Sequence, residues 1–263
     1  MEHYENIHSY LPTDLNQFWF FGQAVVVIIA VVLFRYFLIT GFFWLVFYRW
    51  RPGFLKSRQI YNELPSAGLQ LYEIKMSVLT GILFGLTGAV WGWLWQNGYT
   101  KIYLQFNQYG WLYFFASGFI VSLLHELYFY WTHRWLHHPW AFRRFHAAHH
   151  ESLTPSPWAS FSFHPVEGLI QALALPLISL FIPVHPLVLL TYLTVMTLSA
   201  VGNHLGFELM PRQWGARFFS KTFISGTHHS QHHRFYKYNY GLFYTFSDVI
   251  FRTEHPDYKK PVR

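Results

Sequence analysis

The chain has 263 residues, of which 52% are hydrophobic and 12% charged, about half the charged share of an average soluble domain. Aromatic residues make up 22%, the formal net charge is +7, and cysteine is absent. These values favour a protein whose main solvent is lipid. They exclude disulfides, thiolate zinc sites and cysteine-ligated iron–sulfur clusters within this chain. The basic residues are spread along polar segments, so a membrane surface explains them better than nucleic acid, and no nucleic-acid partner is expected.

Four apolar stretches follow one another along the chain. They run from Phe18 to Phe47, from Met76 to Trp95, from Trp111 to about Trp131, and from Val166 to Val201. Arg35 interrupts the first stretch, so we expect this span to tilt or to end near Arg35, with the guanidinium snorkelling to the headgroups. The fourth stretch is long enough for two helices, and the segment from Pro183 to Pro186 predicts a turn between them. Each arm of this helical hairpin, of about 16 residues, is short for a full crossing.

The sequence therefore predicts an all-α integral-membrane bundle of three spans plus a helical hairpin, as a single membrane domain over residues 1–263. Lysine and arginine predict its sidedness. The loop 48–75 and the polar segments after the third span hold 17 of the 19 basic residues, whereas residues 1–17 hold none. The positive-inside rule then places the N-terminus outside and the histidine-rich segments in the cytosol. Because a basic n-region is missing, no cleaved signal peptide is expected.

Histidine is concentrated in one part of the chain. Of the 17 histidines, 14 lie between His125 and His233. Three clusters stand out there: HRWLH (133–137), HAAHH (146–150) and HSQHH (229–233). Spacings of three and four residues place side chains on one face of a helix, so one helix can present two or three imidazoles to a common point.

The number of clustered histidines indicates more than one metal ion. Imidazole suits zinc, copper, iron and nickel. The HExxH pattern of many catalytic zinc sites does not occur in the sequence, and a b-type haem needs only two axial ligands. Paired redox iron that uses O2 can remove a hydrogen atom from a methylene that no ordinary base deprotonates. A membrane supplies substrates that carry such methylenes.

These residues resemble those of the sterol desaturase and fatty acid hydroxylase superfamily of membrane di-iron oxidases. The likeness covers roughly Ser122 to Pro256 and rests, in order, on YFYWTHRWLHH, RRFHAAHH, PSPWASFSFHPVEG, GNHLGFE, GTHHSQHHRFYKYNYG and FSDVIFRTEHP. The run SFHPVEG before an apolar hairpin, and HSQHH leading to YNYG, are most similar to the sterol C-5 desaturase branch.

The resemblance implies a catalytic region over residues 122–256, with a cytosolic histidine-rich cap that holds two iron ions (Fe2+/Fe3+) and uses O2 as co-substrate. The implied iron ligands are His133, His137, His146, His149, His150, His229, His232 and His233. His204, in GNHLG, is a further expected ligand, and His164 is expected either to bind iron or to support a ligand. The implied partners are a sterol or fatty acyl substrate and an external electron donor such as ferredoxin or a b-type cytochrome.

Four acidic residues are candidates for orienting the histidines, because metal-bound imidazoles usually donate their second N–H to an acceptor. They are Glu126, Glu167, Glu208 and Asp248. Glu126 lies seven residues before His133, two helical turns along roughly the same face. A salt bridge to a neighbouring arginine is the competing interpretation for each of the four.

Three alternatives remain open at this point. The first concerns the product of the reaction: loss of a second hydrogen from the substrate gives an alkene, whereas oxygen rebound gives an alcohol. The second is a fatty-acid, alkyl-ether or carotenoid hydroxylase of the same superfamily. The third is another class, a divalent-metal transporter, although transporter ligands usually lie at mid-bilayer and most of these histidines lie beyond the ends of the predicted spans.

Overall fold

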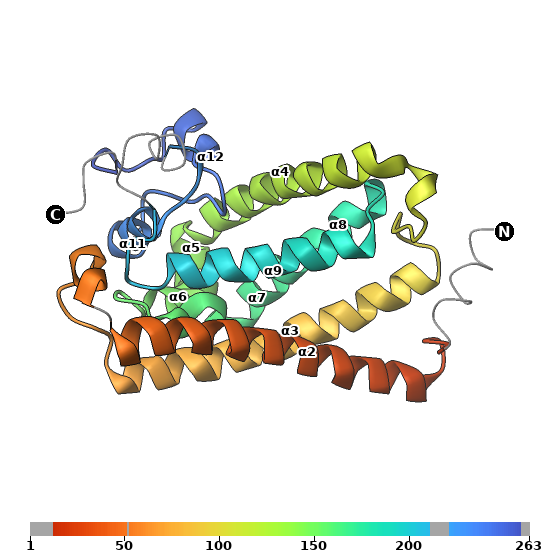
Figure 1. The fold of residues 1–263 in the computed structure, drawn as a ribbon, viewed down its shortest axis with the longest axis horizontal. Helices are drawn as coiled ribbons and strands as arrows, with labels where there is room; N and C mark the ends of the chain where they lie inside the picture. Colours follow the sequence, from red (N-terminus) through yellow and green to blue (C-terminus); the bar gives the residue numbers. More distant parts are fainter. Residues whose placement is uncertain (1–12, 52, 211–220, 259–263) are drawn as a thin grey trace.

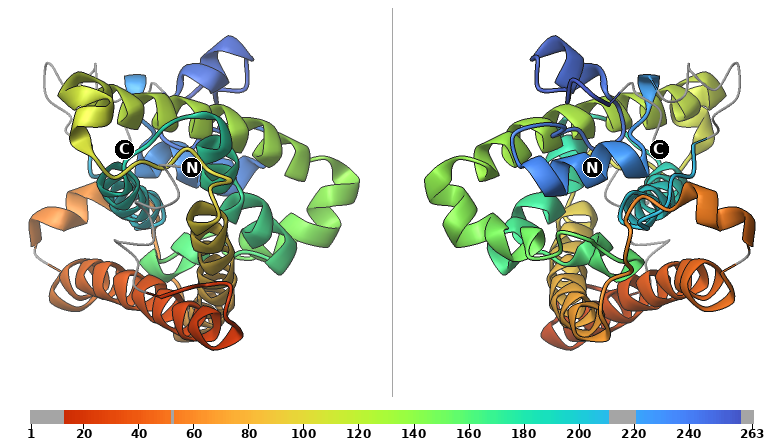
Figure 2. Two further views of the ribbon diagram at one scale, coloured as in Figure 1. Left: turned by 90° about the vertical axis from the view of Figure 1, so that its right-hand side faces the viewer. Right: turned by 90° about the vertical axis from the view of Figure 1, so that its left-hand side faces the viewer.

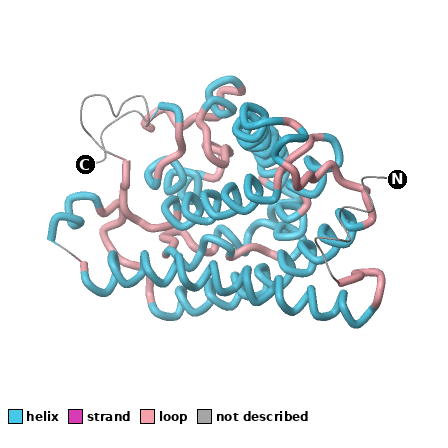
Figure 3. The backbone as a smooth tube through the Cα atoms, turned by 45° about the vertical axis from the view of Figure 1, so that its right-hand side comes forward, coloured by secondary structure: helices cyan, strands magenta, loops and turns pink. Residues whose placement is uncertain are grey.

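The computed structural model describes residues 13–51, 53–210 and 221–258. Within these ranges every regular element is a helix, accompanied only by isolated β-bridges such as that between Gln59 and Phe207. Figure 3 shows helices joined by loops throughout. The all-α prediction is therefore confirmed. The N-terminal segment used in predicting sidedness lies, up to residue 12, outside the described residues.

Four long helices form the body of the molecule. They are α2 (Phe18–Trp44), α3 (Ala67–Gln96), α4 (Gly110–Leu136) and α9 (Pro186–Asn203). The shorter elements are η1 (Leu45–Trp50), η2 (Gly53–Arg58), η3 (Phe106–Gln108), α5 (Pro139–Ala141), η4 (Phe142–His146), α6 (Ala147–His150), η5 (Pro157–Phe161), α7 (Pro165–Ala172), α8 (Ala174–Phe181), α11 (Gly226–Phe235) and α12 (Phe246–Ile250).

All four long helices are long and apolar enough to cross a membrane. At 1.5 Å per residue, the 27 residues of α2 extend about 40 Å, more than the hydrocarbon thickness of a bilayer. Large apolar side chains on these helices point outward; Phe18, Leu112 and Phe115 are 90%, 86% and 70% exposed. Apolar surface on this scale is stable when lipid covers it. The chain is an integral membrane protein.

Helices α2 and α3 pack side by side along one edge of the molecule (Figure 1). The contact is close because α3 places glycines against α2. A Cβ added to Gly85 would lie 2.4 Å from Cγ1 and 2.7 Å from Cα of Ile29. Small residues let membrane helices approach in this way and gain dispersion contacts between backbones.

One of the two arrangements expected for the first span, an end near Arg35, is wrong. Helix α2 does not end at Arg35 but continues to Trp44 and passes directly into η1. The Arg35 side chain lines a cavity between the helices, and its Nε atom is buried. The helix continues because an arginine has good helix propensity and the neighbouring apolar residues can pack on both sides of it.

The hairpin is confirmed, with a difference in its first arm. The turn falls at residues 182–185, between α8 and α9, where the His185 side chain caps α9 and Pro186 occupies its first turn. Proline favours that position because its missing N–H would have no helical partner there. The first arm consists of two eight-residue helices, α7 and α8, that meet at Leu173. The second arm, α9, has 18 residues and qualifies as a span by length.

The ends of the long helices place the histidine-rich segments together. The C-terminal ends of α4 and α9 lie at the same end of the molecule, where α5, α6 and α11 are found (Figures 1 and 2). Helix α12 lies at this end too, beside α4. The histidines at 133–150 and those at 229–233, far apart in sequence, thus share one end of the bundle.

We predict that Gly85→Ala lowers the stability of the protein in detergent, by about 1–3 kcal/mol, because the new methyl group overpacks the contact with Ile29. Thermal unfolding followed by circular dichroism measures the effect. Gly22→Ala on α2 is the control, since a Cβ there meets nothing within 4 Å. Equal unfolding temperatures for the two variants would contradict the close α2–α3 contact.

Candidate metal centre

Nine histidines meet at the end of the bundle. His133 lies in the last turn of α4 and His137 follows as its C-cap. His146 ends η4, and His149 and His150 lie in α6. The other four are His204, the C-cap of α9, and His229, His232 and His233 in α11. All but His137, which is partly buried, are buried.

The nine side chains form two groups. Each residue offers one ring nitrogen, and within a group these nitrogens all lie within 4.8 Å of one another. Group A consists of His133, His137, His146, His150 and His232. Group B consists of His149, His204, His229 and His233. The two groups adjoin, because the rings of His150 and His233 are 4.9 Å apart and those of His149 and His150 are 5.6 Å apart.

Each of the clusters HAAHH and HSQHH contributes histidines to both groups. The segment 146–150 gives its i, i+4 pair, His146 and His150, to group A and His149 to group B. The segment 229–233 does the reverse, giving His229 and His233 to group B and His232 to group A. Residues four apart share a helix face, whereas the remaining histidine is rotated away from it. The spacing thus lets two short helices contribute to two neighbouring sites at once.

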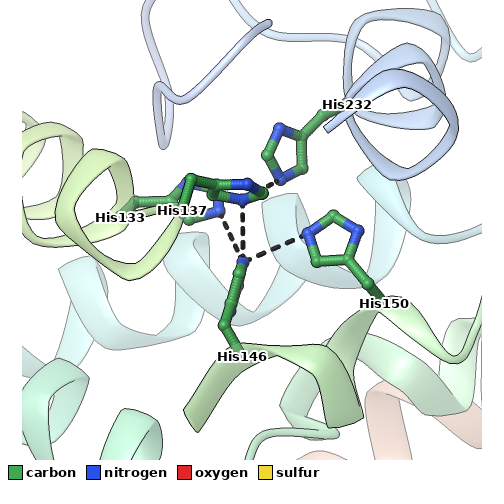
Figure 4. Close-up of side chains that lie close together, drawn as sticks. All are labelled: His133, His137, His146, His150 and His232. Atoms are coloured by element: carbon green, nitrogen blue, oxygen red, sulfur yellow. Dashed lines mark hydrogen bonds between the residues drawn. The ribbon is translucent and has the colours of Figure 1, made fainter. Parts of the chain in front are cut away.

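Ring nitrogens converge closely within the groups. In group A the Nε2 atom of His146 lies 3.2, 3.0 and 3.1 Å from the Nε2 atoms of His133, His137 and His150. Figure 4 shows these rings turned toward one point. The Nε2 atom of His232 lies 3.2 Å from that of His137. In group B the Nε2 atoms of His204 and His229 are 2.9 Å apart.

Backbone carbonyls fix the orientation of four of these rings. The Nδ1 atoms of His133 and His232 in group A lie 2.9 and 2.7 Å from the carbonyl oxygens of Tyr240 and Tyr238. In group B, Nδ1 of His149 lies 3.1 Å from the oxygen of Ser162, and Nδ1 of His204 lies 2.8 Å from that of Ala200. A carbonyl oxygen only accepts, so Nδ1 carries the proton. A neutral ring then presents the Nε2 lone pair to the group.

The rings are held neutral. Burial, together with the charges of neighbouring imidazoles, lowers the pKa of His146, His149, His150, His229, His232 and His233 well below the usual value. Burial also lowers the pKa of His204 to about 4. His133 and His146 each have an acceptor at Nδ1, so their Nε2 lone pairs face each other at 3.2 Å and repel unless a cation lies between them. The donor set therefore fits metal ions with a preference for imidazole.

Among the four acidic candidates, Glu167 contacts a histidine of the groups. Its Oε1 atom lies 2.8 Å from Nδ1 of His146, and both side chains are buried. A carboxylate in this position holds the ring and increases the basicity of the opposite nitrogen.

Glu126 binds a backbone loop, whereas we expected it to orient an imidazole directly. It accepts hydrogen bonds from the backbone N–H groups of Leu242, Phe243 and Tyr244 at distances from 2.8 to 3.2 Å. It contacts the loop that follows Tyr240, whose carbonyl orients His133. Glu126 thus positions the loop, and through the loop a histidine.

Glu208 and Asp248 also bind backbone. Glu208 accepts from the backbone N–H groups of Met210 and Thr227 and so anchors the start of α11. Asp248 accepts from the N–H groups of Tyr240 and Gly241 at 2.8 and 3.0 Å. Burial raises the pKa of Asp248, opposed by these hydrogen bonds. Both carboxylates hold segments that carry or orient histidines.

Several other histidines lie outside the two groups. His164 accepts a hydrogen bond from the Val166 N–H at the start of α7, so the structure does not bring it to either group. His228 is buried 3.7 Å from Asp248, and His138 is exposed. His125 bonds the hydroxyl of Tyr192 within the bundle.

Sequence reasoning missed the carbonyl acceptors of Ser162, Ala200, Tyr238 and Tyr240. Every residue carries a carbonyl, so no residue type marks these positions. The available signal lay in the neighbouring carboxylates, because a buried carboxylate such as Glu126 needs several donors. In this protein the backbone N–H groups of the loop 242–244 donate to the Glu126 carboxylate.

We predict that Glu126→Gln lowers the stability of the protein by about 1–3 kcal/mol, because an amide replaces acceptor capacity with a donor that faces backbone donors. Thermal unfolding of purified protein measures the loss. Glu151→Gln, at an exposed position beside the histidines, should be close to wild type. A neutral effect of Glu126→Gln would show that the loop does not depend on this carboxylate.

Comparisons with known proteins identify relatives of the chain. The chain is 32% identical over 202 residues to lathosterol oxidase of Homo sapiens, covering 76% of this chain and 62% of that protein. It is 29% identical over 231 residues to Delta(7)-sterol 5(6)-desaturase of Gibberella zeae, covering 87% and 64%. A third relative, from Schizosaccharomyces pombe, carries the same desaturase name and is 30% identical over 200 residues, covering 76% and 60%.

The chain thus spans between 62% and 64% of the length of the first curated relatives it matches. No solved structure matches it. The model of the fatty acid hydroxylase family matches residues 118–253, more than half of the chain and the region that contains all nine clustered histidines. The chain belongs to the fatty acid hydroxylase family.

Proposed function

We propose that this protein is a membrane oxidoreductase that uses two iron ions and O2 to desaturate or hydroxylate an unactivated C–H bond of a lipid. The observation that carries the proposal is the convergence of nine imidazole nitrogens into two adjoining groups. Family membership supports the reaction class, and the names of the matched relatives support a sterol as the lipid. The sterol C-5 desaturase type is the specific activity we propose.

The proposed ligands are the nine histidines of groups A and B. When bound, a pair of iron ions supplies the redox chemistry that activates O2 toward a C–H bond. The residues of this chain prepare for that binding. Carbonyl oxygens hold Nδ1–H and leave Nε2 free, and burial keeps the imidazoles unprotonated at neutral pH. His164, which lies outside both groups, is proposed only as a residue that supports the neighbouring helix α7.

The chain also separates the site from water. His146, His232 and His233 are between 0% and 1% exposed. A dry, rigid donor set strengthens electrostatic interactions and suppresses side reactions. Glu167 beside His146 is in position to hold its Nδ1–H.

Sidedness and electron supply form the second part of the proposal. Exposed arginines lie beside the histidine-bearing helices, at Arg134, Arg143, Arg144 and Arg234. Their position supports a cytosolic histidine cap, with the N-terminus on the opposite side, under the positive-inside rule. The same charges suit an acidic external electron donor such as ferredoxin or a b-type cytochrome. Residues 1–263 form one membrane domain in this proposal, with residues 122–256 as its catalytic region.

A metal transporter is less consistent with the arrangement. The histidine groups lie at helix ends and in the short helices beyond them, whereas transporter ligands gather near the bilayer midplane at discontinuous helices. Measurement of O2 consumption against metal flux in vesicles separates the two classes.

We predict that the purified protein contains two iron ions per chain, and that His149→Ala and His232→Ala each lower the iron content by about one per chain, because the two residues belong to different groups. Both variants should lose lipid oxidation. Elemental analysis, O2 consumption and mass spectrometry of the products measure these effects.

His138→Ala is the matched control, because this histidine is exposed, directly follows His137 and lies outside both groups. It should keep the iron content and turnover of the wild type. Turnover like that of the wild type in His149→Ala or His232→Ala would refute the proposal. Addition of oxygen to the product identifies a hydroxylase, and loss of two hydrogens identifies a desaturase.

A further inference from the structure

A partly open cavity lies next to the histidine groups, between the helices of the bundle. It measures about 310 Å³ and is bounded by residues of α2, α3, α4, α7, α8 and α9. The four residues that α9 contributes run from Leu190 to Ala200, which corresponds to about 15 Å at 1.5 Å per residue. The cavity is therefore long enough for an extended lipid chain or a fused-ring lipid.

The cavity meets both histidine groups through one phenyl ring each. Phe129 lines the cavity, and its ring centroid is 5.0 Å from that of His133 in group A. Phe163 also lines the cavity, and its ring is 5.0 Å from that of His149 in group B. One end of the cavity thus lies beside the proposed metal centre.

The wall contains polar side chains that the protein leaves unsatisfied. Nε of Arg35, both amide atoms of Gln171, and Oγ of Ser160 are buried and have no hydrogen-bond partner among the described residues. Ser160 is only 1% exposed. Each unpaired buried polar group costs about 1–3 kcal/mol. Four such atoms around one cavity indicate that a ligand supplies their partners.

Two of the three polar side chains, Ser160 and Arg35, lie toward the histidine end of the cavity. Ser160 adjoins Phe161 and lies close in sequence to Phe163, at the histidine end, and Arg35 is the lining residue of α2 closest to the helix end that lies there. The opposite end is formed by residues such as Ile28, Trp91 and Leu190. An occupant would place its polar part toward the histidines and its apolar part away from them.

We infer that this cavity binds the lipid substrate by an oxygen-bearing head group, held by Arg35, Gln171 and Ser160, so that oxidation takes place on carbons close to that head group. The inference rests on the proposed function and deepens it by naming the recognised chemistry, a hydroxyl or carboxylate at one end of an elongated apolar lipid. The guanidinium and the amide can donate to either oxygen group.

Binding of two matched lipid pairs to the purified full chain tests the inference. The pairs are cholestanol with cholestane, and stearic acid with octadecane; each contrasts an oxygen-bearing head group with a hydrocarbon of the same shape. Native mass spectrometry over a concentration series measures affinity. We expect the oxygen-bearing member of at least one pair to bind about tenfold more tightly, and the pair that shows this preference identifies the head group.

Substitutions show which side chains cause the preference for an oxygen-bearing head group. Arg35→Met and Gln171→Leu should each reduce it by about tenfold, or to none, whereas Arg49→Met, at an exposed arginine farther along the same apolar segment, should retain it. Arg35→Lys keeps the positive charge and should retain part of the preference. Unfolding temperatures confirm that the variants are folded.

Equal binding of both members of each pair by the wild type would overturn the inference, even without any variant. A preference that survives in both Arg35→Met and Gln171→Leu would overturn it as well. Binding requires neither O2 nor turnover, so this result is separate from the test of the metal centre. A protein that binds the oxygen-bearing lipids but contains no iron would contradict the proposed reaction and leave this binding site standing.

Discussion

Unprotonated imidazole nitrogens that face one another are the constraint on which the rest of the structure depends. A buried neutral histidine needs an acceptor for its N–H and a partner for its lone pair. Carbonyl oxygens of Tyr238 and Tyr240 supply acceptors in group A, and those of Ser162 and Ala200 do so in group B. The Nε2 lone pairs of these four rings then point into the two groups, an environment that suits a metal cation.

This constraint explains why buried carboxylates bind loops. Glu126, Glu208 and Asp248 each receive backbone N–H groups at the segments that carry or orient the histidines. The carboxylates restrain irregular backbone that has no helical hydrogen bonds of its own. The closely packed helices α2 and α3 form one wall of the cavity that reaches Phe129 and Phe163. Two phenyl rings thus lie between this cavity and the histidine groups.

Much of this arrangement could be predicted from sequence, because its signals are periodic. Apolar stretches of membrane length identified α2, α3 and α4, and the prolines from 183 to 186 marked the turn before α9. The i, i+4 spacing in HAAHH and HSQHH predicted that imidazoles would share a face. The division of each cluster between two groups could not be predicted, because it depends on how α6 and α11 face each other across the bundle.

Other features were decided by tertiary contacts. Arg35 was expected at the headgroups, but the helix continues and the cavity receives its side chain. Glu126 shares a face with His133, yet its carboxylate turns to the loop at Leu242 because three backbone donors are available there.

X-ray absorption at the iron edge of the purified protein tests the central claim most directly. We predict an iron shell dominated by imidazole nitrogen, whereas a shell dominated by oxygen, or protein without iron, would contradict the account.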